Sequence, residues 1–566
     1  MQAQDDAQWT MPAKDYAATR YSGLRGITAA NVARLRPVWS FSTGVLGGHE
    51  GQPLVAGHTM YVVTPYPNVL YAFDLTRDGY PLKWKYRPSV SPAAIGVACC
   101  DVINRGAFFA GGKIVYNLLD GHTVAIDAAT GAELWKTQVA DLDRGESTPM
   151  APLVVRDRVI VGVSGGEYGV RGWVKGLDLE TGRIVWTAYN AGPDTEVLAD
   201  PATFKPPYDR GADLARTSWP PDGWKHGGAP AWGWLSYDPA LDLFYYGTGN
   251  PAPYNAEQRP GDNKWATSVL ARTPGDGALR WAYQFTPADN WDYDSVQEMI
   301  LVDLRINGRM RKVLVHFDKN GFAYTIDRAT GEVLVAEPYV PVNWAKRVDL
   351  RTGRPEVDST KLTGASRGNV KHICPTLEGG KNQQPAAHSP RTGLFYVPTS
   401  NMCMDYQTSE VTYIVGTPYV GLNAPYQAGP GGNLGAVIAW DAGAGRKVWE
   451  IKEPYPVWSG TLATAGDVVF YGTLDGWFKA ADARTGGGRV LWKFKVGSGV
   501  VGNPITFTGA DGKQYVAVYA GFGGDPFLLA GDVRSDDPAD VRPPASFMPE
   551  IARHTSLGGI VWLFAL

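Results

Sequence analysis

The sequence predicts an all-β protein, an eight-bladed β-propeller, from two observations. The 566 residues include 68 glycines and 41 prolines, and 12% are aromatic. This composition is typical of short strands joined by tight turns rather than of long helices. A motif of the form apolar-x-Asp-x-x-Thr-Gly-x-x-x-Trp also recurs along the chain. Recurrence at such intervals indicates a repeat architecture.

The repeat is clearest in three copies, which end at Trp135, Trp186 and Trp449 with an aspartate eight residues earlier. Each copy reads as a strand, an Asp/Gly turn and a second strand, the pattern of a hairpin. Variant copies end at Trp84, Trp281, Trp492 and Val335, and a partial copy surrounds Trp39. Eight hairpins at the spacing of four-stranded blades predict eight blades closed in a ring, with the tryptophans packed between neighbouring sheets.

We expect the whole chain, residues 1–566, to form a single propeller domain. The intervals from Trp186 to Trp281 and from Val335 to Trp449 exceed the usual repeat spacing. They predict loop insertions at about residues 187–265 and 336–432. Such loops gather over one end of a propeller, where function usually lies.

Charge and hydropathy exclude several classes of partner. A net charge of -3 without any basic cluster argues against nucleic acid and against an anionic membrane surface. No run approaches the ~20 apolar residues of a membrane span. The opening MQAQDDAQW carries no signal peptide, although a mature exported chain behind an added methionine would look the same.

Four cysteines are present, with Cys99 and Cys100 adjacent and Cys374 and Cys403 29 residues apart. The absence of CxxCH excludes an attached c-type haem. An even count without CxxC suits two disulfides in an oxidising compartment at least as well as free thiols. A disulfide between Cys374 and Cys403 would restrain a long loop. For the adjacent pair, two reduced buried cysteines are an equal alternative.

Three turn-like segments carry oxygen ligands, at Glu167, at Asn250 and at Asp292 with Asp294. Oxygen ligands scattered over different blades become neighbours only at the central axis of a propeller. Glutamate, asparagine and paired aspartates suit calcium or a larger ion of higher charge, and not zinc or copper. Each segment by itself is more often an ordinary turn. If extended, the two aspartates point the same way, so a positive group should lie between them.

Longer motifs surround these segments. They are CCDVINRG at 99–106, SGGEYGVRGW at 164–173, WGW at 232–234, GTGNPAPYNAEQRPGDNKW at 247–265 and WDYD at 291–294. Together with the tryptophan repeats, they closely resemble the pyrroloquinoline quinone (PQQ)-dependent alcohol dehydrogenases, in the branch of the methanol and ethanol dehydrogenases. The resemblance runs from about residue 38 to the C-terminus.

The resemblance implies a metal site. Glu167, Asn250 and Asp292 would bind one metal ion, and Asp292 would also be the catalytic base that takes the alcohol proton. Asp294 matches an extra carboxylate of the lanthanide-using members. A third carboxylate suits a trivalent ion better than a divalent one, so we expect a lanthanide(III), with Ca²⁺ as the alternative.

The resemblance also implies PQQ as the cofactor. Trp232 would stack under the quinone ring, and Cys99 with Cys100, as a vicinal disulfide, would cover its other face. The remaining matches to cofactor contacts are Glu50, Arg105, Ser164, Gly165, Gly166, Lys319, Asn382 and Trp458. Lys319 stands where methanol dehydrogenases carry arginine. Pro149 replaces a cofactor-binding threonine, which leaves Thr148 as a shifted candidate.

The implied reaction is oxidation of an alcohol to an aldehyde or ketone by hydride transfer to the quinone. The resemblance further implies a periplasmic monomer or homodimer with a separate electron acceptor, cytochrome c or similar. Asp525 stands where methanol dehydrogenases have tryptophan. That change predicts a substrate bulkier than methanol, such as a secondary alcohol of a polycyclic compound, for example a mycotoxin. A short-chain primary alcohol is the alternative.

A non-catalytic propeller scaffold is the alternative of another class, because the repeats alone permit it. A scaffold, however, has no need to keep Glu167, Asn250, Asp292 and adjacent cysteines together. The motifs therefore favour the enzyme.

Overall fold

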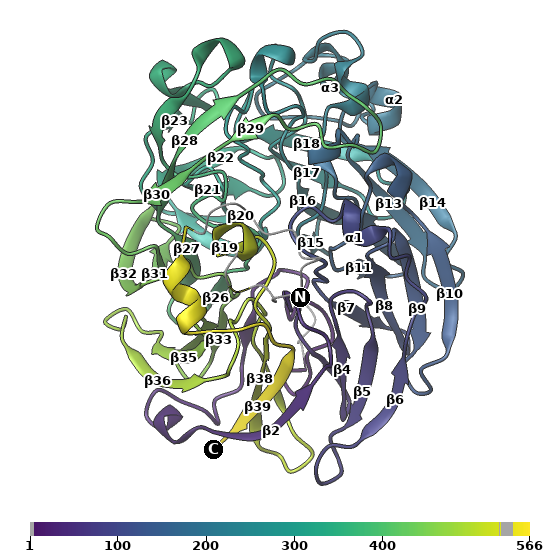
Figure 1. Cartoon of the computed structure of the whole chain (residues 1–566), viewed down its shortest axis with the longest axis vertical. Helices are drawn as coiled ribbons and strands as arrows, with labels where there is room; N and C mark the ends of the chain where they lie inside the picture. The colour runs from purple at the N-terminus through teal and green to yellow at the C-terminus, as the bar shows by residue number, and fades with distance from the viewer. Residues whose placement is uncertain (1–4, 531–532, 534–546) are drawn as a thin grey trace.

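A computed structural model describes residues 5–530, 533 and 547–566 of the chain. Within these residues, eight antiparallel blades follow one another round a ring in chain order (Figure 1). Each blade is built on four strands. The predicted all-β, eight-bladed propeller is confirmed.

The strands have the following bounds. Blades 1 and 2 are β3 (Leu54–Ala56), β4 (Thr59–Val63), β5 (Leu70–Asp74) and β6 (Leu82–Tyr86), then β7 (Ala107–Ala110), β8 (Lys113–Leu118), β9 (His122–Asp127) and β10 (Glu133–Gln138). Blades 3 and 4 are β11 (Leu153–Val155), β12 (Arg158–Gly162), β13 (Trp173–Asp178) and β14 (Ile184–Tyr189), then β15 (Leu235–Asp238), β16 (Leu243–Gly247), β17 (Ser268–Arg272) and β18 (Leu279–Gln284).

Blades 5 and 6 are β19 (Ile300–Ile306), β20 (Arg309–Phe317), β21 (Phe322–Asp327) and β22 (Val333–Pro338), then β26 (Ala387–Ser389), β27 (Leu394–Ser400), β31 (Gly435–Asp441) and β32 (Arg446–Glu453). Blade 7 is β33 (Leu462–Thr464), β34 (Val468–Gly472), β35 (Trp477–Asp482) and β36 (Val490–Lys495), with β1 (Tyr21–Ser22) added in parallel at β33. Blade 8 is β37 (Ile505–Thr508), β38 (Gln514–Ala520), β39 (Ile560–Ala565) and β2 (Arg36–Ser42).

The repeat tryptophans pack between blades, as the sequence predicts. The indole Nε1 of Trp135 in blade 2 donates to the carbonyl of Leu179 in blade 3, 3.0 Å away. A Cβ on Gly182 would lie 2.6 Å from the Trp135 ring, so the turn position that faces the ring requires glycine. The same bond joins Trp39 to Gly79, Trp186 to Pro274, Trp281 to Arg328, Trp449 to Arg484 and Trp492 to Leu35.

The ring closes by pairing the two ends of the chain. β2, from the N-terminal part, is antiparallel to β39, with Phe41 opposite Val561. The blade packing buries most of the middle strands, and every position of β4 and β34 is buried. The apolar core therefore lies in the interfaces between blades.

The N-terminal segment from Ala7 to Arg20 contacts the first strand of every blade in turn. Its backbone bonds go, in order, to Thr508, Val55, Phe109, Tyr237, Leu301, His388 and Ala463, and the Tyr16 hydroxyl donates to Val154. These partners represent blades 8, 1, 2, 4, 5, 6, 7 and 3. The segment thus follows the blades round the axis and ties them to one another.

The two stretches predicted as insertions hold blade strands as well as loops. Residues 187–265 contain β15 and β16 with the short helices α2 (Asp194–Val197) and α3 (Leu214–Thr217), and residues 336–432 contain β26 and β27. The repeat motif lies on the last two strands of a blade. Repeat spacing therefore cannot separate the first two strands of the next blade from an insertion.

The true additions in residues 336–432 are two small sheets. One is the hairpin of β23 (Ala345–Asp349) and β24 (Arg354–Val357), and the other joins β25 (Val370–Ile373), β28 (Met402–Thr408), β29 (Leu422–Asn423) and β30 (Tyr426–Ala428). The predicted disulfide between Cys374 and Cys403 is present. It connects β28 to the residue after β25. None of the described helices is long and apolar enough to span a membrane.

Candidate active site

A cavity of about 530 Å³ opens where loops from many blades meet. Its walls come from two kinds of loop: those that enter the first strand of a blade and those between the second and third strands. Adjacent strands of a blade are antiparallel, so both kinds of loop leave the sheet at the same end. First strands contact one another from blade 1 to blade 5 and between blades 6 and 7. Polar residues on these loops therefore converge at one end of the axis.

Asp292 and Asp294 lie together on the loop that enters β19, and a positive group binds both. The Lys319 ammonium, from the loop between β20 and β21, is 3.2 Å from Asp292 Oδ2 and 2.7 Å from Asp294 Oδ2. Asp292 is not extended, because its φ is 66°. The two carboxylates thus meet through a bent loop rather than through strand alternation.

Asp289 holds that bent loop. Its carboxylate accepts hydrogen bonds from the backbone amides of Trp291, at 3.0 Å, and Tyr293, at 3.1 Å. The buried Arg259 guanidinium binds the Asp289 carbonyl. These bonds enclose Asp292 on both sides, so they fix the direction in which its carboxylate points.

Glu167 and Asn250 reach the same cavity from blades 3 and 4. Glu167 lies in a 3₁₀ turn, Gly166–Tyr168, between β12 and β13. The backbone amide of Asn250 donates to Asp294 Oδ1 at 2.6 Å. A Cβ at Gly249 would lie 2.6 Å from that same oxygen, so the approach of Asp294 requires a glycine there.

The lining of the cavity carries more negative than positive side chains. Burial raises the pKa of Asp292 well above its usual range; Lys319 lowers it and Asp294 raises it further. Burial also raises the pKa of Glu167, to about 7. The described lining residues include six carboxylates, Asp101, Glu167, Asp292, Asp294, Glu378 and Asp525, but two cationic side chains, Arg105 and Lys319.

The oxygen-rich lining fits a bound metal cation. Carboxylate and amide oxygens are the ligands of hard ions such as calcium and its trivalent relatives. Several carboxylates buried together are stable only beside compensating positive charge. A cation held by Glu167, Asn250, Asp292 and Asp294 would supply that charge and lower the pKa of Asp292 again.

A flat aromatic surface and a disulfide lie on the walls of the cavity. Trp232 and the bonded pair Cys99 and Cys100 all line it, and the predicted vicinal disulfide is present. The Arg105 guanidinium lies 4.9 Å from the centre of the Trp232 ring and 3.0 Å from Glu50. Burial raises the pKa of Glu50 to about 8, although Arg105 opposes this. Glu50 does not line the cavity itself; it binds the Arg105 side chain, which does.

Unsatisfied polar atoms beside this surface fit a planar polar cofactor. Among the described residues, no hydrogen-bond partner reaches Asn382 Oδ1 or Trp458 Nε1, and both atoms are buried. Ser164 lines the cavity, whereas Trp458 is buried behind it. Gly165 and Gly166 form the turn that carries Glu167 and do not line the cavity themselves.

Thr148 faces away from the cavity. Its hydroxyl donates to the Leu118 carbonyl at 2.7 Å, whereas Ser147 and Pro149 on either side of it line the cavity. Side chains alternate along an extended segment, so a shift by one residue reverses the direction. We therefore replace Thr148 by Ser147 as the candidate cofactor contact.

Several lining residues escaped the motif comparison. The cavity is also lined by Tyr254, Glu378 and Tyr426. Asp525 lines it too, and its place in the chain was expected from the resemblance. Tyr254 lies inside the GTGNPAPYNAEQRPGDNKW motif, which could have singled it out. Glu378 and Tyr426 come from the added sheet region, and no local signal indicates that they approach the axis.

Comparisons with known proteins identify the family of this chain. The model of the glucose/ethanol/alcohol dehydrogenase β-propeller domain matches residues 9–351 and 451–516. The chain is 53% identical to the lanthanide-dependent methanol dehydrogenase of Methylacidiphilum fumariolicum, over 99% of this chain and 93% of that protein. It is 43% identical to methanol dehydrogenase (cytochrome c) subunit 1 of Methylobacterium organophilum, over 100% of this chain and 92% of that one.

A solved structure, a europium-containing methanol dehydrogenase, matches with a TM-score of 0.95 and 53% identity. The match covers 100% of this chain and 99% of that chain. The family model, the relatives and the solved structure thus agree on one family. The chain belongs to the pyrroloquinoline quinone-dependent alcohol dehydrogenases.

Proposed function

We propose that this protein oxidises an alcohol bulkier than methanol to the aldehyde or ketone, with PQQ and one metal ion. The observation that carries the proposal is the convergence of Asp292, Asp294, Glu167 and Asn250 on one cavity with excess negative charge. A base, a set of oxygen ligands and an aromatic wall are the protein groups that metal-assisted hydride transfer to a quinone requires.

Each of these side chains has a proposed role. Bound PQQ would supply the hydride acceptor, and a metal ion would polarise it. Asp292 accepts the proton of the substrate hydroxyl, for which its carboxylate must be ionised. Glu167, Asn250 and Asp294 hold the metal together with Asp292, with lanthanide(III) preferred over Ca²⁺. Lys319 contacts both aspartates and keeps them in position.

The proposed substrate size rests on Asp525. This residue lies on the cavity wall, and by resemblance it takes the place of a tryptophan in methanol dehydrogenases. The smaller side chain leaves space in the cavity that also contains the proposed base, and Leu528, 39% exposed, adds apolar surface to the lining. A secondary alcohol of a polycyclic compound, such as a mycotoxin, would use this space. The methanol dehydrogenases among the relatives favour the alternative, a short-chain primary alcohol.

Partner and location are part of the same proposal. We infer a separate electron acceptor, cytochrome c or similar, because two relatives are named methanol dehydrogenase (cytochrome c) subunit 1. Two disulfides suit an oxidising compartment, which supports a periplasmic location. We propose a monomer or homodimer.

Activity of the loaded protein tests the proposal. We expect apoprotein supplied with PQQ and either La³⁺ or Ca²⁺ to reduce an artificial dye when alcohols are added. We also expect kcat/KM to be higher for secondary cyclic alcohols than for methanol. Absence of dye reduction with every metal and alcohol would contradict the enzyme, and a maximum at methanol would contradict the substrate size.

The variant Asp294→Ala tests the choice of metal. It removes one carboxylate from the proposed ligand set, so the trivalent ion should lose more of its stabilisation than the divalent ion. We expect lanthanide-dependent kcat to fall on the order of tenfold more than calcium-dependent kcat, as for other changes around metal sites. Equal losses with both ions would show that Asp294 does not select the metal.

A further inference from the structure

We propose that Asp101 is a positioning residue, which fixes the wall formed by the vicinal disulfide and the wall formed by Asp525 relative to each other. The inference rests on the proposed function, because both walls belong to the proposed site for cofactor and substrate. Asp101 directly follows Cys100 and lines the same cavity as Asp525. None of the roles assigned above uses its side chain.

The Asp101 carboxylate joins two loops that lie far apart in the sequence. Its Oδ2 accepts hydrogen bonds from the backbone amides of Gly48 and Gly524, each at 2.9 Å. Its Oδ1 accepts from the amide of Val102 at 2.7 Å. Gly48 lies between β2 and β3, and Gly524 precedes α4 (Pro526–Leu529). Hydrogen bonds to a carboxylate are about twice as strong as neutral ones, so this one side chain holds both loops.

The two loops approach the carboxylate so closely that glycine is required. A Cβ on Gly48 would lie 2.7 Å from Asp101 Oδ2 and 2.6 Å from the amide nitrogen of Gly524. A Cβ on Gly523 would collide with the same Oδ2. Asp101 itself has a φ of 105°, which residues other than glycine rarely adopt. Such a backbone persists only where the surrounding contacts impose it, so the three segments are built around this carboxylate.

The two bound loops carry residues of the proposed site. Gly524 is followed by Asp525, and two residues after Gly48 comes Glu50, which pairs with Arg105 at 3.0 Å. A Cβ on Gly524 would collide with Glu50 Oε1, so Gly524 packs directly against that ion pair. The carboxylate therefore sets the position of a proposed cofactor contact and of the residue proposed to select substrate size. Displacement of such groups lowers rate and affinity.

Two substitutions separate the carboxylate of Asp101 from its backbone. Asp101→Gly tolerates the positive φ but removes the acceptor oxygens. Asp101→Asn also tolerates this backbone and keeps one oxygen, which can accept from both glycine amides. For the PQQ- and metal-loaded enzyme, we measure kcat/KM for cyclohexanol and for methanol. We expect the ratio of cyclohexanol to methanol to fall about tenfold in Asp101→Gly, because Asp525 is no longer fixed where it leaves room for the larger alcohol. In Asp101→Asn the ratio should stay within about threefold.

Cofactor binding gives a second readout that does not depend on turnover. PQQ titrated into apoprotein that holds the metal should quench tryptophan fluorescence, because Trp232 lines the cavity. We expect Kd for PQQ to rise about tenfold in Asp101→Gly, since the loops are no longer held in place before binding, and to be largely restored in Asp101→Asn. A fall in Tm without a change in Kd or in the alcohol ratio would overturn the proposal.

The matched control is Asp467→Gly. Asp467 is another aspartate at positive φ, 60°, but it lies in the turn between β33 and β34 and does not line the cavity. This substitution changes the backbone freedom of an aspartate in the same way as Asp101→Gly. We expect it to leave the alcohol ratio and Kd for PQQ unchanged.

Hydrogen exchange tests the inference without any substitution. In the unchanged apoprotein, the amides of Gly48 and Gly524 should exchange at least about tenfold more slowly than the amide of Gly275, an exposed turn glycine. Mass spectrometry with fragmentation to single amides measures these rates. Rapid exchange of both amides would show that the Asp101 carboxylate does not hold the loops.

The outcomes separate the two proposals. Absence of dye reduction by the unchanged, loaded enzyme would contradict the proposed function, while PQQ binding and hydrogen exchange would still test Asp101. If the unchanged enzyme oxidises alcohols and Asp101→Gly alters neither the alcohol ratio nor Kd for PQQ, the role of Asp101 is overturned and the proposed function stands.

Discussion

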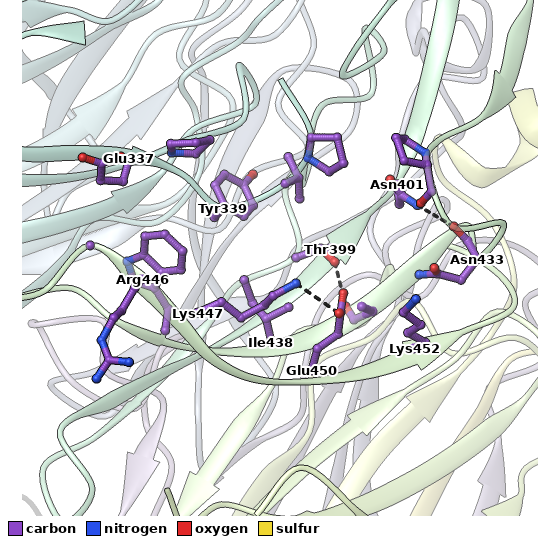
Figure 2. A pocket seen from close by; sticks show the side chains of 17 residues that line it. Glu337, Tyr339, Thr399, Asn401, Asn433, Ile438, Arg446, Lys447, Glu450 and Lys452 are labelled. Atoms are coloured by element: carbon purple, nitrogen blue, oxygen red, sulfur yellow. Dashed lines mark hydrogen bonds and ion pairs between the residues drawn. The ribbon is translucent and has the colours of Figure 1, made fainter. Parts of the chain in front are cut away.

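Two cavities of nearly equal size differ in how their charges are satisfied. The central cavity measures about 530 Å³, and the inter-blade groove, lined by β22, β27, β31 and β32 side chains, measures about 520 Å³. In the groove, Lys447 and Glu450 pair at 3.0 Å with 43% and 29% of their side chains exposed (Figure 2). In the central cavity, Asp292, Asp294 and Lys319 are 7% exposed or less.

The difference shows that volume does not identify an active site. Solvent screens the groove pair, and an exposed ion pair of this kind contributes about 0–1 kcal/mol. The central carboxylates are shielded from water and outnumber their cations. Orphaned polar atoms such as Asn382 Oδ1 lie beside them. Buried groups that the protein leaves unsatisfied are therefore the mark of a ligand site.

The largest expected effect comes from the proposed base. Asp292→Asn keeps the shape of the side chain but removes its ability to accept a proton. We expect kcat to fall about 10³-fold, within the range of general-base catalysis. The matched control is Glu450→Gln in the groove, which neutralises a carboxylate of a similar-sized cavity and should leave kcat unchanged. If kcat fell less than tenfold in Asp292→Asn, Asp292 would not be the catalytic base.

Asp289 should have an intermediate effect, because it orients the base without facing the cavity. Asp289→Ala removes both bonds to the backbone around Asp292, and small displacements of reacting groups cost up to about 10²-fold in rate. We expect kcat to fall by about that factor with little change in KM, and Asp289→Asn to restore part of it. A rise in KM at constant kcat would assign Asp289 to substrate binding instead.

The groove should give the smallest effect. Lys447→Ala breaks its ion pair with Glu450, and the free energy of unfolding should change by about 1 kcal/mol or less. Denaturant unfolding measures this change, and steady-state assays should show unchanged kcat and KM. A clear loss of activity would mean that the groove, too, contributes to function.

Much of the fold could be predicted because its signals are local. The Thr-Gly turn and the tryptophan belong to one hairpin, so their spacing of a few residues identifies each blade. The glycine has a direct cause, since Gly182 faces the Trp135 ring of the preceding blade. Closure of the ring through β2 and β39 joins distant segments and carries no comparable local signal.

The site residues also divide into those that local motifs identify and those that only the tertiary structure places. Motif resemblance identified Glu167, Asn250, Asp292 and Asp294, which do line one cavity. It misplaced Thr148, whose hydroxyl binds the Leu118 carbonyl, because the direction of one side chain depends on how its loop is bound. The two predicted insertions were too wide for a related reason: the first strands of blades 4 and 6 lack the repeat.

The sequence by itself determined the number of blades, the positions of the four cysteines and the identity of the paired aspartates, because each depends on short-range patterns. The structure then showed which cysteines are bonded. Only the tertiary structure decided that Lys319 lies between those aspartates. It likewise decided that Asn382 meets Asp525, 143 residues further along the chain. Such contacts depend on where antiparallel blades bring their loops around an axis. Local propensity does not encode that geometry; the packing of all eight blades produces it.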